Sequence, residues 1–95
     1  MSQTVSKPRV SGPGSGLDSN WRVIVRNDDH NTFDHVAMCL AEYIPGITLD
    51  KGYAIAERIH TSGLALVWSG HKEAAELYWD ELRGHGLTMA PLERV

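Results

Sequence analysis

Two sets of polar side chains in this chain could do chemistry. The first is the run RNDDHNTFDHV, Arg26 to Val36, which places two Asn, three Asp and two His in one short connection. The second is His60, which directly follows the apolar residue Ile59. Such groups bind metals, transfer protons or accept hydrogen bonds from a cationic ligand. The spacing of the residues decides among these three uses.

Metal binding is the first use to weigh, because His30, His35, His60, Asp28 and Cys39 are all permitted ligands. The two nearest histidines are five positions apart, and the sequence contains neither an HExxH pair nor a second cysteine. Structural and catalytic zinc sites need closer or regularly paired ligands. We therefore expect no metal and no cofactor.

A hydrolase would pair His60 with Asp28 or Asp29 as a proton-transfer dyad. The sequence offers that dyad no nucleophile, since Cys39 lies among apolar helix positions and Ser62 lies in a turn. We expect that the chain is not an enzyme. A small metal-dependent or His-dependent enzyme remains the rival hypothesis.

A structural interpretation of Asn27-Asp28-Asp29 must also be kept. Asn and Asp side chains commonly bind the N–H groups of the residues that follow them, which shapes a turn between a strand and a helix. On that interpretation the run holds the backbone and binds nothing.

The amino-acid composition limits the classes of partner that the chain can bind. The 95 residues form one modest domain and carry a formal net charge of -3 at pH 7. Nucleic acid and anionic membrane surfaces call for clustered Lys and Arg, so we expect neither partner.

No apolar run approaches the ~20 residues of a membrane span. The single cysteine suits a reducing compartment, and we expect a cytoplasmic protein, with an organelle as the alternative because the start is basic and Ser-rich.

Periodic elements must position these residues. Residues 1–19 are rich in Ser, Gly and Pro and predict a flexible extension, followed by one folded domain over 20–95. The alternating pattern predicts strands at 21–26, 64–68 and 87–92. Helical spacing predicts helices at 33–44, 48–62 and 70–84, capped by Asn31 or Thr32, by Thr48 and by Ser69. The order β-α-α-β-α-β predicts an α+β fold, with three helices on a three-stranded, mainly antiparallel sheet.

The residues reached so far resemble those of a known family. The segment Val23-Ile-Val-Arg-Asn27-Asp28-Asp29, an amphipathic helix and then Ile59-His60-x-x-Gly63 before a strand are similar to the ClpS family of protease adaptors. The similarity continues through Glu73-Ala-Ala-Glu76 and the closing Pro91-Leu92-Glu93. It implies an adaptor of the N-end rule. Such an adaptor binds proteins whose first residue is large and apolar and delivers them to a Clp AAA+ unfoldase, ClpC or ClpA, for degradation by ClpP. For this chain we expect Leu first among such residues.

The resemblance also implies roles for individual residues. The family's α-amino-binding Asn, Asp and His match Asn27, Asp28 and His60, and Asp29 matches a supporting Asp. The matching walls of the hydrophobic pocket are Asn31, Phe33, Val36, Ala56, Ile59 and Leu92. Phe33 and Ala56 both stand where methionine is common in the family. We therefore expect an altered preference among Leu, Phe, Tyr and Trp.

Docking on the unfoldase is implied at Glu73, an acidic position in the family, whereas Tyr78 replaces a basic one. Residues 1–19 match the extension thought to enter the unfoldase pore, and a monomer is expected. A further alternative is a regulator that docks on the unfoldase and binds no substrate.

Overall fold

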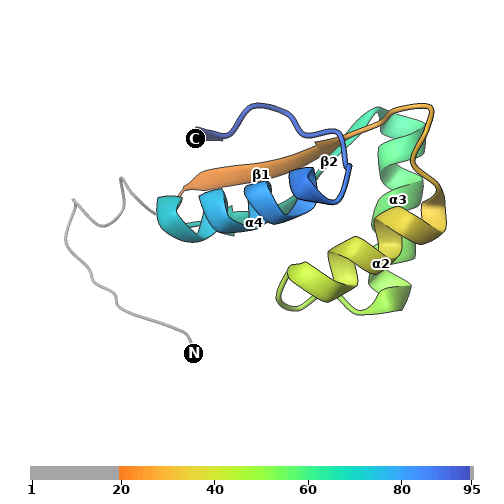
Figure 1. Cartoon of the computed structure of the whole chain (residues 1–95), viewed down its shortest axis with the longest axis horizontal. Helices are drawn as coiled ribbons and strands as arrows, with labels where there is room; N and C mark the ends of the chain where they lie inside the picture. The colour runs from red at the N-terminus through yellow and green to blue at the C-terminus, as the bar shows by residue number, and fades with distance from the viewer. Residues whose placement is uncertain (1–19, 95) are drawn as a thin grey trace.

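The computed structural model describes residues 20–94 and contains the expected sheet (Figure 1). Strand β1 (Trp21–Arg26) lies in the middle, with β2 (Leu64–Gly70) on one side and β3 (Glu93–Arg94) on the other, and both pairings are antiparallel. The extension predicted for residues 1–19 lies outside the described residues.

Three helices complete the domain: α2 (Phe33–Tyr43), α3 (Leu49–Ser62) and α4 (Lys72–Gly84). Helices α2 and α3 pack mainly against each other at one end of the sheet, while α4 runs along β1 and β2 (Figure 1). The predicted α+β fold and its order β-α-α-β-α-β are confirmed. None of the helices among the described residues has the length and apolar character needed to cross a membrane.

The helix caps follow the predicted chemistry at two of three places. Thr32 caps α2 by accepting a hydrogen bond from His35 N (3.0 Å), and Thr48 caps α3 in the same way from Lys51 N (3.2 Å). Ser69 was expected to cap α4, and that prediction is wrong. Strand β2 continues through Ser69, so the helix begins later, behind His71, which makes no side-chain capping bond.

The predicted strand at 87–92 is also wrong in its bounds. Over that stretch the chain follows β1 only irregularly, through a bridge between Val25 and Met89 and a bond from Ala90 N to Ile24 O (3.0 Å). The regular strand is the pair Glu93–Arg94. Pro91 separates the two parts because it has no N–H to donate to a ladder.

The core joins the sheet to all three helices. Its most deeply buried side chains are Val23 and Val25 from β1, Leu40 from α2 and Leu82 from α4. Helices α2 and α3 approach closely at Gly52, where an added Cβ would lie 2.6 Å from the carbonyl oxygen of Ala37. This contact sets the spacing of the two helices that carry the pocket walls described next.

Candidate functional site

A pocket of about 260 Å³ opens where β1 ends, between the start of α2, one side of α3 and the segment that follows α4. All but one of the residues that the sequence assigned to the pocket and its polar rim line it. They are Asn27, Asp28, Asp29, Asn31, Phe33, Val36, Ala56, Ile59 and His60. Segments far apart in the sequence therefore converge on one cavity.

The floor of the pocket is apolar. Val36 from α2 and Ala56 and Ile59 from α3 are buried, and each lines the cavity. Leu87, from the segment after α4, completes this surface and is also buried. The floor can receive a hydrophobic side chain and offers it no hydrogen bonds.

Phe33 stands at the mouth rather than in the core. It is 41% exposed, and its ring meets the edge of the His60 ring with centroids 5.3 Å apart. A side chain this exposed is not part of the core. A ligand entering the pocket would pass beside this pair of rings.

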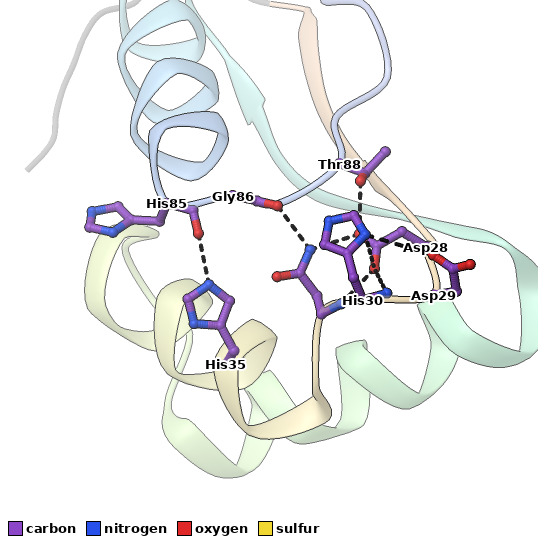
Figure 2. Close-up of polar contacts among 8 residues, drawn as sticks. Asp28, Asp29, His30, His35, His85, Gly86 and Thr88 are labelled. Atoms are coloured by element: carbon purple, nitrogen blue, oxygen red, sulfur yellow. Dashed lines mark hydrogen bonds and ion pairs between the residues drawn. The ribbon is translucent and has the colours of Figure 1, made fainter.

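Asp28 lies on the inner side of the turn, where its side chain is 12% exposed. Its Oδ1 accepts from His30 N (3.1 Å) and Asn31 N (2.8 Å), and its Oδ2 accepts from Asn31 Nδ2 (2.7 Å) and the Thr88 hydroxyl (2.7 Å). Figure 2 shows Asp28 turned toward Thr88. The structural interpretation of the polar run is therefore correct for Asp28, since all four bonds come from the protein itself.

These bonds keep Asp28 ionised. Burial is the largest single influence and pushes its pKa upward, but the hydrogen bonds from Asn31, Thr88 and His30 outweigh it. The net effect is a pKa well below the ordinary range of aspartate. A negative charge is thus fixed beside the pocket at any pH near neutrality.

Some of the other polar side chains at the rim of the pocket differ from Asp28, because they take part in no hydrogen bonds among the described residues. Within residues 20–94, neither the side-chain amide of Asn27 nor either ring nitrogen of His60 has a hydrogen-bond partner, and both residues are exposed. Asp29 projects into solvent and has only His30, at 3.8 Å, near its carboxylate. The rim therefore presents two unpaired polar side chains and one carboxylate to a ligand.

Leu92 was predicted as a pocket wall, but the structure places it elsewhere. It lies in a separate shallow groove beside Trp79 and Pro91 of the α4 side. Leu87 lines the pocket instead of Leu92, and Thr88 lines it as well. Gly86, with a φ of 93°, turns the chain back directly after α4, so the first apolar residue beyond it is the one that reaches the pocket. That glycine is the signal that could have identified Leu87.

The remaining predicted residues lie on α4. Glu73 is exposed in the first turn of the helix. Tyr78 is half-buried, with its ring set edge-on against Trp68 of β2 at 4.9 Å. Glu73 can meet a partner directly, whereas most of the Tyr78 ring packs against the sheet.

The histidines and the cysteine do not assemble a metal site among the described residues. His35 donates through Nε2 to the carbonyl oxygen of His85 (2.7 Å; Figure 2). Cys39 Sγ lies 3.6 Å from the same nitrogen. Burial, reinforced by the charge of Glu42, raises the pKa of the Cys39 thiol, which makes it a poor nucleophile.

Comparison with known proteins matches residues 17–91 to the family model "ATP-dependent Clp protease adaptor protein ClpS". The chain is 56% identical over 75 residues to the ATP-dependent Clp protease adapter protein ClpS of Synechocystis, covering 79% of this chain and 76% of that protein. It is 57% identical over 74 residues to the protein of the same name from Nostoc, covering 78% and 76% of the two chains.

One solved structure has the same fold. The structure of Agrobacterium tumefaciens ClpS2 bound to L-phenylalaninamide superimposes with a TM-score of 0.70 at 21% sequence identity, covering 82% of this chain and 99% of that one.

Proposed function

This chain belongs to the ClpS family of ATP-dependent Clp protease adaptor proteins, and we propose that its pocket binds the N-terminus of substrate proteins that begin with a large apolar residue. The chain then delivers the bound protein to a Clp AAA+ unfoldase, ClpC or ClpA, for degradation by ClpP. It works as a monomeric cytoplasmic adaptor and performs no catalysis of its own.

One observation carries the proposal: unpaired acceptors stand directly above an apolar floor. A free α-amino group is largely cationic at neutral pH and offers three N–H donors. The amide oxygen of Asn27 and a ring nitrogen of neutral His60 can each accept one of these donors. The ionised Asp28 behind them and Asp29 beside them supply the negative potential that a cation requires.

Asp28 and Asp29 therefore have different roles toward the ligand. All four hydrogen bonds to Asp28 come from within the protein, so it acts on the ligand through charge and through the shape of the turn. Asp29 is free to approach the amine directly or through water. In this proposal Asp28 supplies charge, whereas Asn27 and His60 supply direction.

The first residue of a substrate is selected by the sum of two contributions to the binding free energy, one from its side chain and one from its α-amino group. Burying a Leu or Phe side chain contributes ~1.5–3 kcal/mol, and each hydrogen bond to a charged group contributes ~1.5–3 kcal/mol before ordering costs. An acetylated terminus loses the charge, and an internal Leu lacks the amine, so neither gains both terms. L-phenylalaninamide, the ligand of the Agrobacterium protein, combines a free amine with a large apolar side chain and has both features.

Delivery to the unfoldase uses α4 in this proposal. Glu73 offers an exposed carboxylate at the start of the helix, which suits a basic patch on the partner. Tyr78 contributes only the accessible part of its ring, because the rest packs on Trp68. Contact at this position therefore lacks the positive charge that a basic side chain would supply.

A second candidate is a regulator that docks on the unfoldase but carries no substrate. The observation that favours it is Phe33, whose ring meets that of His60 across the mouth of the pocket. A closed mouth would leave docking intact and substrate binding absent.

Fluorescence polarisation with a Leu-initiated peptide tests the proposal. We expect micromolar or tighter binding, and no binding of the N-acetylated twin. Asn27→Ala and His60→Ala are the matched variants, because both side chains are exposed and accept no hydrogen bond from within residues 20–94, so we expect folding to be preserved. Each variant should weaken binding by about tenfold or more, as expected for loss of a hydrogen bond to a charged group.

The opposite result is equally informative. If the unaltered chain ignores Leu-, Phe-, Tyr- and Trp-initiated peptides yet binds the unfoldase, the docking-only function replaces the adaptor function. Equal binding of the free and acetylated peptides would show that the pocket reads only the side chain.

A further inference from the structure

The segment after α4 is held to the opposite wall of the pocket by side chains. The Thr88 hydroxyl donates to Asp28 Oδ2 (2.7 Å), and Asn31 Nδ2 donates both to the same oxygen (2.7 Å) and to the carbonyl oxygen of Gly86 (2.9 Å). Figure 2 shows the Asp28, Gly86 and Thr88 partners together. We call Asp28, Asn31 and Thr88 the Asp28 clasp. It joins the end of β1, the entry to α2 and the segment after α4 at one carboxylate.

The clasp has little freedom to rearrange. Both partners of Asn31 Nδ2 are acceptors, so the side-chain amide must present its NH₂ group, and both of its N–H donors are used. Thr88 is fixed twice, because its own carbonyl oxygen accepts from Arg26 N (2.8 Å). Its hydroxyl is therefore presented to Asp28 from a backbone already bound to β1.

Two ligand-facing groups depend on this arrangement. Leu87, which supplies part of the apolar floor, lies between the two held points Gly86 and Thr88. Asn27, which offers its amide to the ligand, directly precedes Asp28. Releasing the clasp would let the Leu87 wall and the Asn27 acceptor move relative to each other.

We propose that Thr88 is a positioning residue for recognition of the substrate N-terminus. The proposal rests on the function proposed above. The single hydrogen of the Thr88 hydroxyl is already donated to Asp28, so it is not available to a ligand. Thr88 acts through Asp28 and Leu87: it completes the four-bond shell of the carboxylate and holds the segment 86–88 against the pocket.

The experiment compares Thr88→Val with Thr88→Ser. Valine keeps the shape of threonine but removes the hydroxyl, whereas serine keeps the hydroxyl. We expect Thr88→Val to weaken binding of a Leu-initiated peptide by about tenfold, the effect of one hydrogen bond to a charged group. Thr88→Ser should stay within about twofold of the unaltered chain, because it retains that bond.

Thr48→Val is the matched control for stability. Thr48 caps α3 at the end remote from the pocket by accepting from Lys51 N, and it does not line the cavity. Its loss should lower the melting temperature, as removal of a helix cap does, and leave peptide affinity unchanged. A weakening of affinity in Thr88→Val alone therefore reports positioning rather than general destabilisation.

The outcomes separate the two proposals. If the unaltered chain binds the peptide and Thr88→Val binds equally well, the positioning role is overturned and the proposed function stands. If Thr88→Ser is as weak as Thr88→Val, the hydroxyl is not the cause, and the role is likewise overturned. If the unaltered chain binds no peptide, both proposals fall together.

Discussion

The inner and outer sides of the β1–α2 turn are built from the same residue types but are used differently. On the inner side, Asp28 is nearly buried and accepts four hydrogen bonds from the protein. On the outer side, Asn27 and Asp29 are exposed, and His60 faces them from α3 with free ring nitrogens. One short polar run therefore supplies both the scaffold of the site and two of its exposed polar groups, while α3 supplies the third.

This difference shows how a small domain can hold a rigid polar rim. Acceptors that stand free in solvent lose orientation unless the backbone beneath them is fixed. Asp28 holds the backbone N–H groups of His30 and Asn31, and Asn27 N donates to the carbonyl oxygen of Gly63 (2.9 Å), so the backbone on both sides of the turn is tied down. Binding groups on the outside are thus made possible by satisfied groups on the inside.

Replacing the inner carboxylate should have the largest effect. Asp28→Ala removes four hydrogen bonds and leaves N–H and O–H donors unpaired, so we expect a loss of about 2–4 kcal/mol of unfolding free energy together with peptide binding. Urea denaturation and polarisation measure the two losses. Asn27→Ala is the contrast, since it should cost binding with a stability change within about 0.5 kcal/mol. If both variants are equally stable, the division between the inner and outer sides is wrong.

Lowering the pH should gradually remove the contribution of Asp28 to the free energy of unfolding. The pKa of Asp28 is lowered in the folded chain, so the unfolded chain binds its proton first as the pH falls. The contribution is complete above the ordinary aspartate pKa of 3.8 and is lost as the pH falls below it toward the lowered folded value. Urea denaturation between pH 7 and pH 2 should show this loss in the unaltered chain and a flatter curve in Asp28→Ala. Identical slopes would mean that Asp28 is not specially stabilised.

The sequence predicted the elements of the fold better than the long-range hydrogen bonds that link them. Periodicity located five of the six elements well, because each has its own hydrophobic pattern and most have a local stop such as Gly63. The polar rim could be identified because Asn27, Asp28 and His60 are unusual for a turn and a helix end. Resemblance to a family then supplied the pocket walls.

Long-range pairing could not be read in the same way. The hydroxyl that satisfies Asp28 comes from a residue 60 positions away, and nothing local to Thr88 indicates that partner. Leu92 was assigned to the pocket, whereas Leu87 lines it, for a related reason. Both are apolar residues near the end of the chain, and only the turn at Gly86 and the irregular path before Pro91 decide which one faces the pocket.

A change in the helix spacing tests whether the apolar floor also needs a rigid support. Gly52→Ala would place a Cβ 2.6 Å from the carbonyl oxygen of Ala37, so α2 and α3 must separate. We expect a loss of about 1–3 kcal/mol, typical of overpacking, and weaker peptide binding because Val36 and Ala56 move apart. Gly84→Ala is the matched control, because nothing lies within 4 Å of its added Cβ. An equal response of the two variants in thermal unfolding would contradict the close helix contact.

The smallest effect is expected from replacing Phe33 at the mouth of the pocket. This side chain takes no part in the hydrogen bonds of the inner side. Its ring is 41% exposed and contacts His60 edge-on, so its replacement removes little core packing. Phe33→Met gives a more flexible side chain at the same place. We expect stability to change by less than about 0.5 kcal/mol and the ratio of affinities for Leu- and Trp-initiated peptides to shift by about threefold, since a pocket discriminates only modestly by apolar size. Competition between the two peptides measures that ratio directly. If the ratio is unchanged while both affinities fall together, Phe33 acts by orienting His60 for the amine, and the mouth then belongs with the scaffold rather than with the groups that select the side chain.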